Sequence, residues 1–533
     1  MKRIVSLVLA LAMVLSLCIF TTASADDGFV DGKFTKTRHI TVEVYNRYND
    51  GGSDPTSSVY AQYIKQGMLD KYNVDVELVS VGRWTEVDDL NNLLATGDAP
   101  DVCVTYSYPT IQTFAGMGGI IDLNPLLTEY KDLLPDLWAL LGDYNIYYDQ
   151  DPETGSVWAI EAVLAESARI NTFIRKDWLD KLGLKLPTTE EEFHNCLIAF
   201  RDNAELLLGA DAAKMVPFSI STDIGWRADL LNVSKVPEDV SDETLYVYGY
   251  DDRHLLYPNY KEGIRVLNQW YNEGLIWKDF ALYTDASVED DMMKSGFVGA
   301  FIHNWDYPYR NGEDSIQANL TRANGADAGF IAVDCFQNDA GITRKYLADR
   351  IDRKVFFPAT NDEPLASLLY LISSEETIKF LQTGKEGVTY KMTDNGAYEM
   401  LNATGEWIMN SGMNIDHTIT VNGLYLGDAT AATKALSYPG VNPDFIITAN
   451  TYGKLNGRIV KKFSCGAISA EEDVGTSLNS KRDAMLTQAV VAPVDQFDSV
   501  YDKGMADYLA SGGQNIIDER REKLEAIYGV HVD

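Results

Sequence analysis

The first regular pattern in the chain is Ile40-Thr41-Val42-Glu43-Val44, where apolar and polar residues alternate with the two-residue period of a β-strand. Downstream, Asp54-Pro55 has the form of a helix N-cap followed by proline at the first helical position. Residues 74–81 alternate again, residues 86–94 have helical spacing, and residues 101–104 form a short apolar strand. This order of strands and helices predicts a parallel sheet covered by helices.

Polar and aromatic residues follow two of these predicted strands. Tyr45 and Arg47 come directly after the first strand, and Tyr106 follows the third. In open α/β sheets, ligands bind beyond the carboxyl ends of the strands. We therefore expect these three residues to face a cleft.

A second α/β unit begins near Arg169. Phe173-Ile174 is strand-like, Lys176 to Leu182 has helical spacing, and Thr188-x-x-Glu191 is a capping box that opens another helix. No repeat and no Pro/Ser-rich linker separates this unit from the first. The sequence predicts two closely packed lobes, with the chain crossing between them more than once.

The N-terminus has the features of a secretory signal peptide. Lys2-Arg3 precedes an apolar run from Ile4 to Phe20, and Ala23-Ser24-Ala25 is an A-x-A cleavage site. We expect residues 1–25 to be removed and the exported protein to be extracellular or bound to the cell surface. Cys18 offers an alternative, because Leu15-Ser16-Leu17-Cys18 resembles a lipobox, although Leu17 occupies a position that normally requires a small residue.

Length and charge restrict the remaining possibilities. A chain of 533 residues exceeds one ordinary core, so two or more domains are expected. The formal net charge of −34 argues against nucleic acid as a partner. Four cysteines beyond the signal peptide are far apart and are interpreted as buried free thiols: Cys103, Cys196, Cys335 and Cys465.

Three motifs carry a resemblance to a known family. The run from Phe173 to Leu184, continued by Pro187-Thr188-Thr189 and Glu192-Phe193, is similar to the "RKDWLDKLGL-x-x-PTT-x-x-EF" segment of the family 1 extracellular solute-binding proteins. Residues 267–276 resemble their "WY-x-EGLI" helix end, and residues 293–305 their short helix and strand that end in an aromatic residue. The motifs follow the family order across nearly the whole mature chain.

The resemblance implies a type II periplasmic-binding-protein-like fold, with two α/β lobes, a hinge and a ligand cleft between the lobes. We assign residues 26–165 and about 330–380 to the N-terminal lobe, and residues 166–329 and about 381–533 to the C-terminal lobe. Relatives that bind alginate carry an acidic calcium loop, but residues 201–206 lack the alternating oxygen ligands that calcium needs. No metal or cofactor is therefore expected.

The ligand implied by the resemblance is a sugar, which requires aromatic platforms and hydrogen-bonding groups. Trp305 is the first candidate for stacking and Trp226 the second, although core packing is the usual fate of a tryptophan. Trp84 and Trp158 are weaker candidates, and Trp178 and Trp270 are interpreted as core residues of helices. The predicted ligand-binding set is Trp305, Trp226, Tyr106, Tyr45, Arg47, Asp306 and Glu166; for its three charged members, ordinary surface or inter-lobe salt bridges are the alternative interpretation.

The leading hypothesis is a non-enzymatic, monomeric substrate-binding component of an ABC importer. It would capture a carbohydrate, in particular an oligosaccharide, by lobe closure and deliver it to membrane permease subunits. A secreted polysaccharide-acting enzyme is the alternative, but the chain has no G-x-S-x-G, H-E-x-x-H, P-loop or G-x-G-x-x-G motif. A surface sugar receptor without a transport role also remains open.

Overall fold

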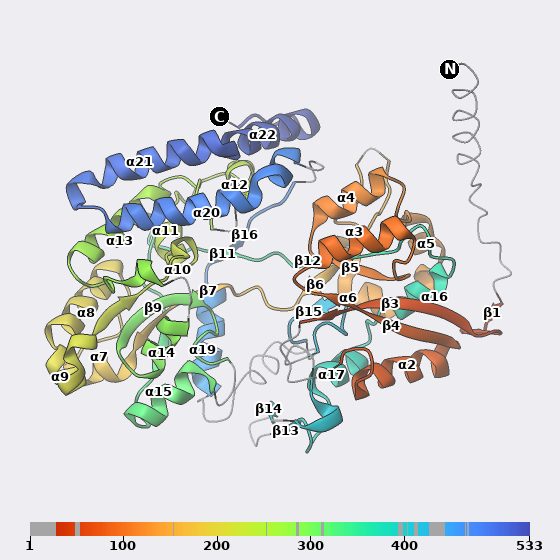
Figure 1. The fold of residues 1–533 in the computed structure, drawn as a ribbon, viewed down its shortest axis with the longest axis horizontal. Coiled ribbons are helices and arrows are strands. Elements are labelled where there is room, and N and C mark those ends of the chain that lie inside the picture. The colour runs from red at the N-terminus through yellow and green to blue at the C-terminus, as the bar shows by residue number, and fades with distance from the viewer. Residues whose placement is uncertain are drawn as a thin grey trace.

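The computed structural model describes residues 28–532 apart from 48–53, 153, 252, 284–286, 311–313, 393–397, 402, 410–413, 426–442, 464 and 466–467. The predicted signal peptide and Cys18 lie outside the described residues. Two lobes lie side by side (Figure 1), and each cluster of buried hydrophobic residues that the described chain forms belongs to one lobe. Each lobe therefore has its own core.

The sheet of the first lobe begins with the predicted strands. β3 (Arg38–Asn46) and β4 (Val74–Gly82) are parallel, and a parallel bridge from Val42 to Val102 connects β3 to β5 (Cys103–Thr105). The sheet continues in the order β5, β12 (Ile351–Phe356), β6 (Ile160–Leu164) and β15 (Val421–Asn422).

The parallel arrangement predicted for the strands within residues 40–104 is confirmed. The sheet also contains β12, for which no direction was predicted and which is antiparallel to both of its neighbours. The chain enters β12 directly from the second lobe, at the edge where β5 and β6 end, so β12 must run in the opposite direction. The other elements of this lobe are α2 (Val59–Tyr72), α3 (Glu86–Thr96), α4 (Tyr108–Gly116), α5 (Asn124–Glu129), α6 (Pro135–Ile146), α16 (Pro364–Tyr370), α17 (Glu375–Thr383), β1 (Phe29–Val30), β2 (Lys33–Phe34), β13 (Tyr390–Met392), β14 (Tyr398–Met400) and the short 3-10 turns Lys131–Leu133 and Gly405–Trp407.

The second lobe has a four-stranded sheet in the order β10 (Phe330–Val333), β7 (Ile170–Arg175), β9 (Val298–Asn304) and β8 (Val216–Ser219). The long C-terminal helices α20 (Ser469–Val491), α21 (Phe497–Tyr508) and α22 (Gln514–Tyr528) cross one side of this lobe (Figure 1). Its other elements are α7 (Lys176–Leu182), α8 (Glu190–Asp202), α9 (Ala204–Leu208), α10 (Ile224–Arg227), α11 (Asp229–Val233), α12 (Asp242–Tyr248), α13 (Tyr260–Asn272), α14 (Ser287–Lys294), α15 (Ile316–Asn324), α19 (Pro443–Lys454), β11 (Lys345–Leu347), β16 (Gly457–Ile459), the short turns Gly209–Lys214, Phe280–Leu282 and Val494–Gln496, and a π-helical turn at Leu509–Gly513.

Two predicted helix starts are displaced by a few residues. Asp54 accepts hydrogen bonds from the backbone and hydroxyl of Thr56 and therefore closes a turn, while Ser58 caps α2. At α8 the N-cap is Thr189 rather than Thr188, and Glu192 binds back to Thr188. The apolar periodicity located both helices, whereas the choice between adjacent capping residues depended on the backbone path.

The chain crosses between the lobes at residues 165–169 and again just before β12, and it passes from β15 in the first lobe to α19 in the second. The predicted lobe boundaries need two corrections. Residues 330–347 belong to the second lobe, because β10 pairs with β7 and β11 with β16. Part of the segment after residue 381 belongs to the first lobe, because β15 pairs with β6.

Several residue interpretations are confirmed. The four cysteines from Cys103 to Cys465 are free and buried, and Trp178 and Trp270 are each 2% exposed within the second core. Within the described part of the chain, no helix combines the length and the apolar character needed to cross a membrane.

Candidate ligand-binding site between the lobes

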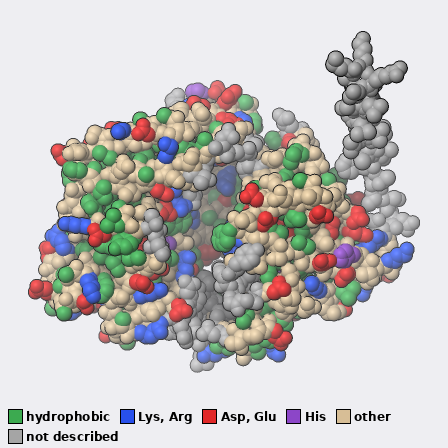
Figure 2. All heavy atoms as spheres, in the orientation of Figure 1, with side chains coloured by type: hydrophobic (Ala, Val, Ile, Leu, Met, Phe, Trp, Pro, Cys, Tyr) green, Lys and Arg blue, Asp and Glu red, His purple; other side chains and the backbone are tan. Residues whose placement is uncertain are grey.

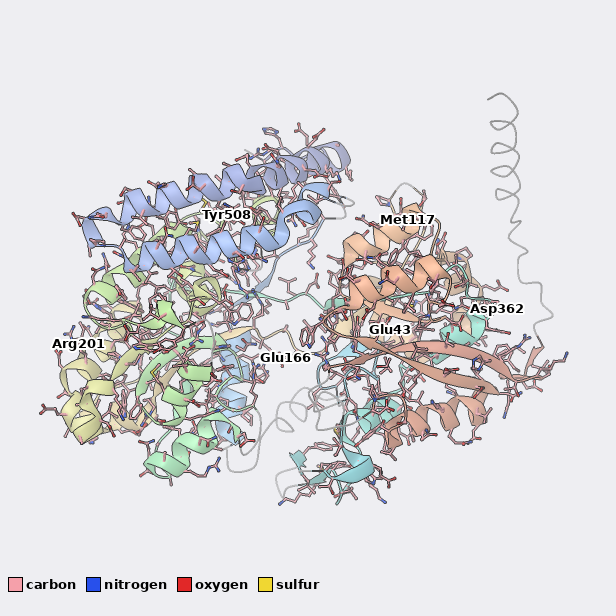
Figure 3. The ribbon with its side chains drawn as sticks, viewed as in Figure 1. Glu43, Met117, Glu166, Arg201, Asp362 and Tyr508 are labelled. Carbon is pink, nitrogen blue, oxygen red and sulfur yellow. The ribbon has the colours of Figure 1, made fainter. Side chains whose placement is uncertain are left out.

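The strands of the first lobe end at one edge, which faces the second lobe. Asn46 pairs with Gly82 at the ends of β3 and β4, and β5 and β6 share a direction because both are antiparallel to β12. The first crossing leaves this edge after Leu164. Figure 2 shows the surface hollowed between the lobes, and Figure 3 places Glu166 of the crossing between them. This hollow is called the cleft below.

An aromatic and arginine cluster forms the first-lobe wall of the cleft. Tyr106 follows β5, and the Arg83 guanidinium lies 3.9 Å from the centre of its ring. Trp84, which follows β4, is 71% exposed, and the Arg83 guanidinium lies 5.1 Å from its indole ring. An indole this exposed has apolar surface available to a ligand.

The buried carboxylate of Glu86 holds this wall in place. It accepts hydrogen bonds from the Thr105 hydroxyl at 3.1 Å and from the Tyr106 backbone N–H at 2.8 Å. It also pairs with Arg83 at 3.1 Å. Because Glu86 is the first residue of α3, the positive end of the helix dipole also favours its charge. Glu86 therefore fixes the arginine and the tyrosine relative to each other.

The second-lobe wall is built around Trp226 of α10. Its indole N–H donates to the Asn304 side chain at 2.8 Å, at the end of β9 where Asn304 pairs with Ile170. The guanidinium groups of Arg169 and Arg253 lie 5.0 and 4.7 Å from the indole centre. Since Arg169 ends the first crossing, this cluster adjoins the hinge.

Two predicted stacking residues are not in a position to stack. Trp305 is 7% exposed and packs in the second-lobe core with Phe173 and Ile446. Tyr45 is 2% exposed, and its hydroxyl donates to the Val104 carbonyl at 2.9 Å. Both side chains point from a strand end into a core, because alternate residues of a strand face opposite sides.

The three predicted charged residues have carboxylate or cationic partners within the protein. Arg47 binds Asp416 of the first lobe through two hydrogen bonds of 2.7 and 2.9 Å. Asp306 pairs with Arg310 at 2.5 Å. Glu166 binds Asn450 at 2.6 Å and Lys454 at 2.8 Å, both on α19, so it ties the first crossing to the second lobe. Of the predicted residues, Tyr106, directly after β5, and Trp226, on α10, are partly exposed.

Trp84 was a weaker candidate from the sequence but is the most exposed of these aromatic residues, and Arg83 and Arg253 were not singled out for binding. The dipeptides Arg83-Trp84 and Trp226-Arg227 were visible signals, since each puts a cation beside an aromatic residue after a strand or at a loop. The pairing of Arg253 with Trp226 could not be found in this way, because 27 residues separate them and the fold alone brings them together.

Glu43 lies buried behind the first-lobe wall, inside the sheet (Figure 3). One carboxylate oxygen accepts from the Val104 N–H at 2.8 Å, and the other has no hydrogen-bond partner among the described residues. Burial raises the pKa of Glu43 well above 4.5, and the nearby Glu86 carboxylate adds to this shift. The native state therefore favours the neutral carboxyl group.

This raised pKa predicts a pH-dependent stability. As the pH rises above about 4.5, Glu43 ionises first in the unfolded chain, so stability falls until the native pKa is passed. Glu43→Gln should remove that part of the slope and stabilise the first lobe at pH 7 by about 1–3 kcal/mol. Urea unfolding at a series of pH values from about 4 to 8 measures the free energy of unfolding and its slope with pH. Exposed Glu77→Gln on β4 is the control, and an unchanged slope in Glu43→Gln would contradict the assignment.

Comparison with known proteins gives one sequence relative that spans most of the chain and two partial ones, while no family model matches the chain. The polygalacturonan/rhamnogalacturonan-binding protein YtcQ of Bacillus subtilis is 20% identical over 465 residues, which is 85% of this chain and 86% of YtcQ. The lipoprotein LipO of Bacillus subtilis is 26% identical over 244 residues, which is 44% of this chain and 45% of LipO. The fructooligosaccharide ABC transporter substrate-binding protein FusA of Streptococcus pneumoniae is 27% identical over 42% of this chain and 39% of FusA. The matches to LipO and FusA thus span less than half the length of either relative.

Solved structures match over almost the whole chain. An HMO-binding solute-binding protein associated with an ABC transporter, from Bifidobacterium longum infantis, gives a TM-score of 0.63 at 15% identity, over 92% of this chain and 99% of the other. The alginate-binding protein AlgQ2 without calcium gives 0.57 at 17% identity, over 90% and 98% of the two chains. FusA of S. pneumoniae in complex with kestose gives 0.60 at 14% identity, over 92% and 100%.

The fold is therefore the type II periplasmic-binding-protein-like fold: two α/β lobes, each with its own core, joined by chain crossings beside a cleft. The fold class predicted from the sequence is confirmed. The structural neighbours and the partial relatives also confirm the predicted resemblance to the extracellular solute-binding proteins of ABC transporters.

Proposed function

We propose that this protein is the extracellular substrate-binding component of an ABC importer and that it captures an oligosaccharide in the cleft. The observation that carries the proposal is the pair of opposed walls, with Trp84 and Tyr106 on one lobe and Trp226 on the other. Sugar rings present apolar C–H faces to such side chains and hydroxyl groups to the neighbouring guanidinium N–H groups.

Capture requires the ligand to contact both lobes. An oligosaccharide that bridges Trp84 and Trp226 would gain contacts in the closed state that are absent from the open state, so binding would favour closure. The lobes would move as units about the crossings, because each has a separate core. Arg169 and Glu166, on the first crossing, would couple the hinge to the second-lobe wall.

The side chains around the cleft favour binding of a sugar over its hydrolysis. A glycosidase needs two carboxyl groups placed on either side of the scissile bond. The carboxylates beside the aromatic walls, Glu86 and Asp223, are each engaged by an arginine. We further propose that the protein acts as a monomer outside the membrane and delivers its ligand to permease subunits. Because the partial relative LipO is a lipoprotein, the proposal includes attachment of this protein to the membrane through a lipid on Cys18.

A ligand screen tests the proposed function. The purified protein should show a raised melting temperature with one class of oligosaccharide, by an amount that grows with ligand concentration. Chromatography of the same incubation should recover the sugar intact. Cleaved products would support the enzyme alternative, and the absence of binding to any member of a broad oligosaccharide panel would contradict the proposal.

A further inference from the structure

Two of the three arginines beside the aromatic walls, Arg253 and Arg83, are paired with carboxylates of the protein, while Arg169, also over Trp226, lies 3.4 Å from a ring nitrogen of His254. Arg253, over Trp226, binds Asp223 through two hydrogen bonds of 3.0 and 2.7 Å. Arg83, over Tyr106, binds Glu86 at 3.1 Å. Each of these two paired guanidinium groups thus has a protein anion on part of its hydrogen-bonding edge.

Three further cations, in segments close to strand ends or to the crossings, are paired in the same way. Arg47 binds Asp416, Arg310 binds Asp306, and Lys454 binds Glu166, all within 2.5–2.8 Å. A further carboxyl group, Asp352, accepts from Asn422 at 2.7 Å, and the same amide nitrogen lies 3.5 Å from the Tyr106 hydroxyl. Among the described residues, these ion pairs contribute no net positive charge.

The net charge of the whole molecule also disfavours an anionic ligand. With a formal net charge of −34, the protein repels an anion at long range unless a local cationic cluster reverses the field. An acidic sugar would also have to displace a carboxylate from an arginine, whereas a hydroxyl group can bind the remaining N–H groups without separating the pair. Uncharged sugars therefore fit this cleft better than uronic acids.

We infer that the ligand is an uncharged oligosaccharide and that the Asp223–Arg253 pair excludes acidic sugars from the wall around Trp226. This inference rests on the proposed function and narrows it. It makes Asp223 a specificity-determining residue, because its carboxylate occupies the arginine that an acidic sugar would otherwise bind.

The experiment compares uncharged and acidic oligosaccharides of three to five units at low ionic strength, by calorimetry and thermal shift. Fructo-, gluco-, xylo- and galacto-oligosaccharides represent the first group, and oligogalacturonates and oligomannuronates the second. Binding confined to the uncharged group supports the inference. Salt-sensitive binding of the acidic group overturns the inference but leaves the proposed function standing, whereas binding of neither group overturns the proposed function itself.

A charge-neutral variant tests the role of Asp223 directly. Asp223→Asn should bind an oligogalacturonate at least about 10-fold more tightly than the parent protein does, because it removes the Asp223 carboxylate from the hydrogen-bonding edge of Arg253. Asp498→Asn is the matched control, since it removes the same charge from Asp498 of α21, which forms an exposed pair with Arg265 of α13. If both variants gain equally or neither gains, Asp223 does not set the preference and the inference fails.

Discussion

A Trp84→Ala variant is expected to bind the oligosaccharide ligand about 30- to 150-fold more weakly than the parent protein, a loss of roughly 2–3 kcal/mol. The substitution removes an exposed indole that offers apolar area and a stacking face at the cleft. Because the ring is 71% exposed, its loss should change the melting temperature of the unliganded protein by no more than about 2 °C. Titration calorimetry and thermal unfolding measure the two quantities.

Leu282→Ala is a suitable control for Trp84→Ala. Leu282 is 76% exposed and lies in the second lobe, so its truncation removes exposed apolar surface without altering the first-lobe wall. Its affinity should match that of the parent protein. A Trp84→Ala protein with full affinity would show that the ligand does not use this wall.

The second large effect is a loss of stability on breaking the buried ion pair beneath Trp226. Arg227, the residue after Trp226, is 2% exposed and pairs with Glu289 of α14, which is 3% exposed. Glu289 also accepts from the Ser219 hydroxyl at 2.7 Å, at the end of β8. Glu289→Ala should destabilise the second lobe by about 3–5 kcal/mol, because it leaves a buried guanidinium without its counter-charge.

Urea unfolding monitored by tryptophan fluorescence measures the Glu289→Ala effect. The exposed pair Arg265–Asp498 supplies the comparison, and Asp498→Ala should cost at most about 1 kcal/mol. The double variant Arg227→Met, Glu289→Leu should recover most of the lost stability, since it removes both buried charges together. A small effect of Glu289→Ala would mean that water or another group compensates Arg227.

Periodicity and motif were sufficient for the fold class because they reflect local properties of the chain. The alternation around Val42 and in residues 74–81 follows from burial on one side of a strand. These signals yielded the α/β order and the two lobes. They did not fix where the chain crosses for the second and third time, because strand pairing such as β10 with β7 or β15 with β6 is a long-range property.

Sequence reasoning proposed aromatic and charged side chains near strand ends as the ligand-binding residues, and two of the aromatic ones are buried in the cores. Trp226 and Tyr106 are partly exposed, while Trp305, directly after β9, and Tyr45, near the end of β3, turn into the cores. A shift of one residue along a strand reverses the side of the sheet to which a side chain points. A sequence pattern locates a strand end only to within one or two residues, so it cannot decide that side.

Local chemistry alone thus indicated the α/β units, the buried thiols and the resemblance to solute-binding proteins. It also predicts the export signal, which lies outside the described residues. The positions of the charges in the cleft came from tertiary packing. Arg253 reaches Trp226 and Asp223, and Arg47 reaches Asp416 across 369 positions of sequence, through contacts that no local pattern encodes. An arginine that is paired with a carboxylate attracts an anionic ligand less than an unpaired arginine does. The charge of the ligand could therefore be inferred only from the tertiary structure, which shows these pairs.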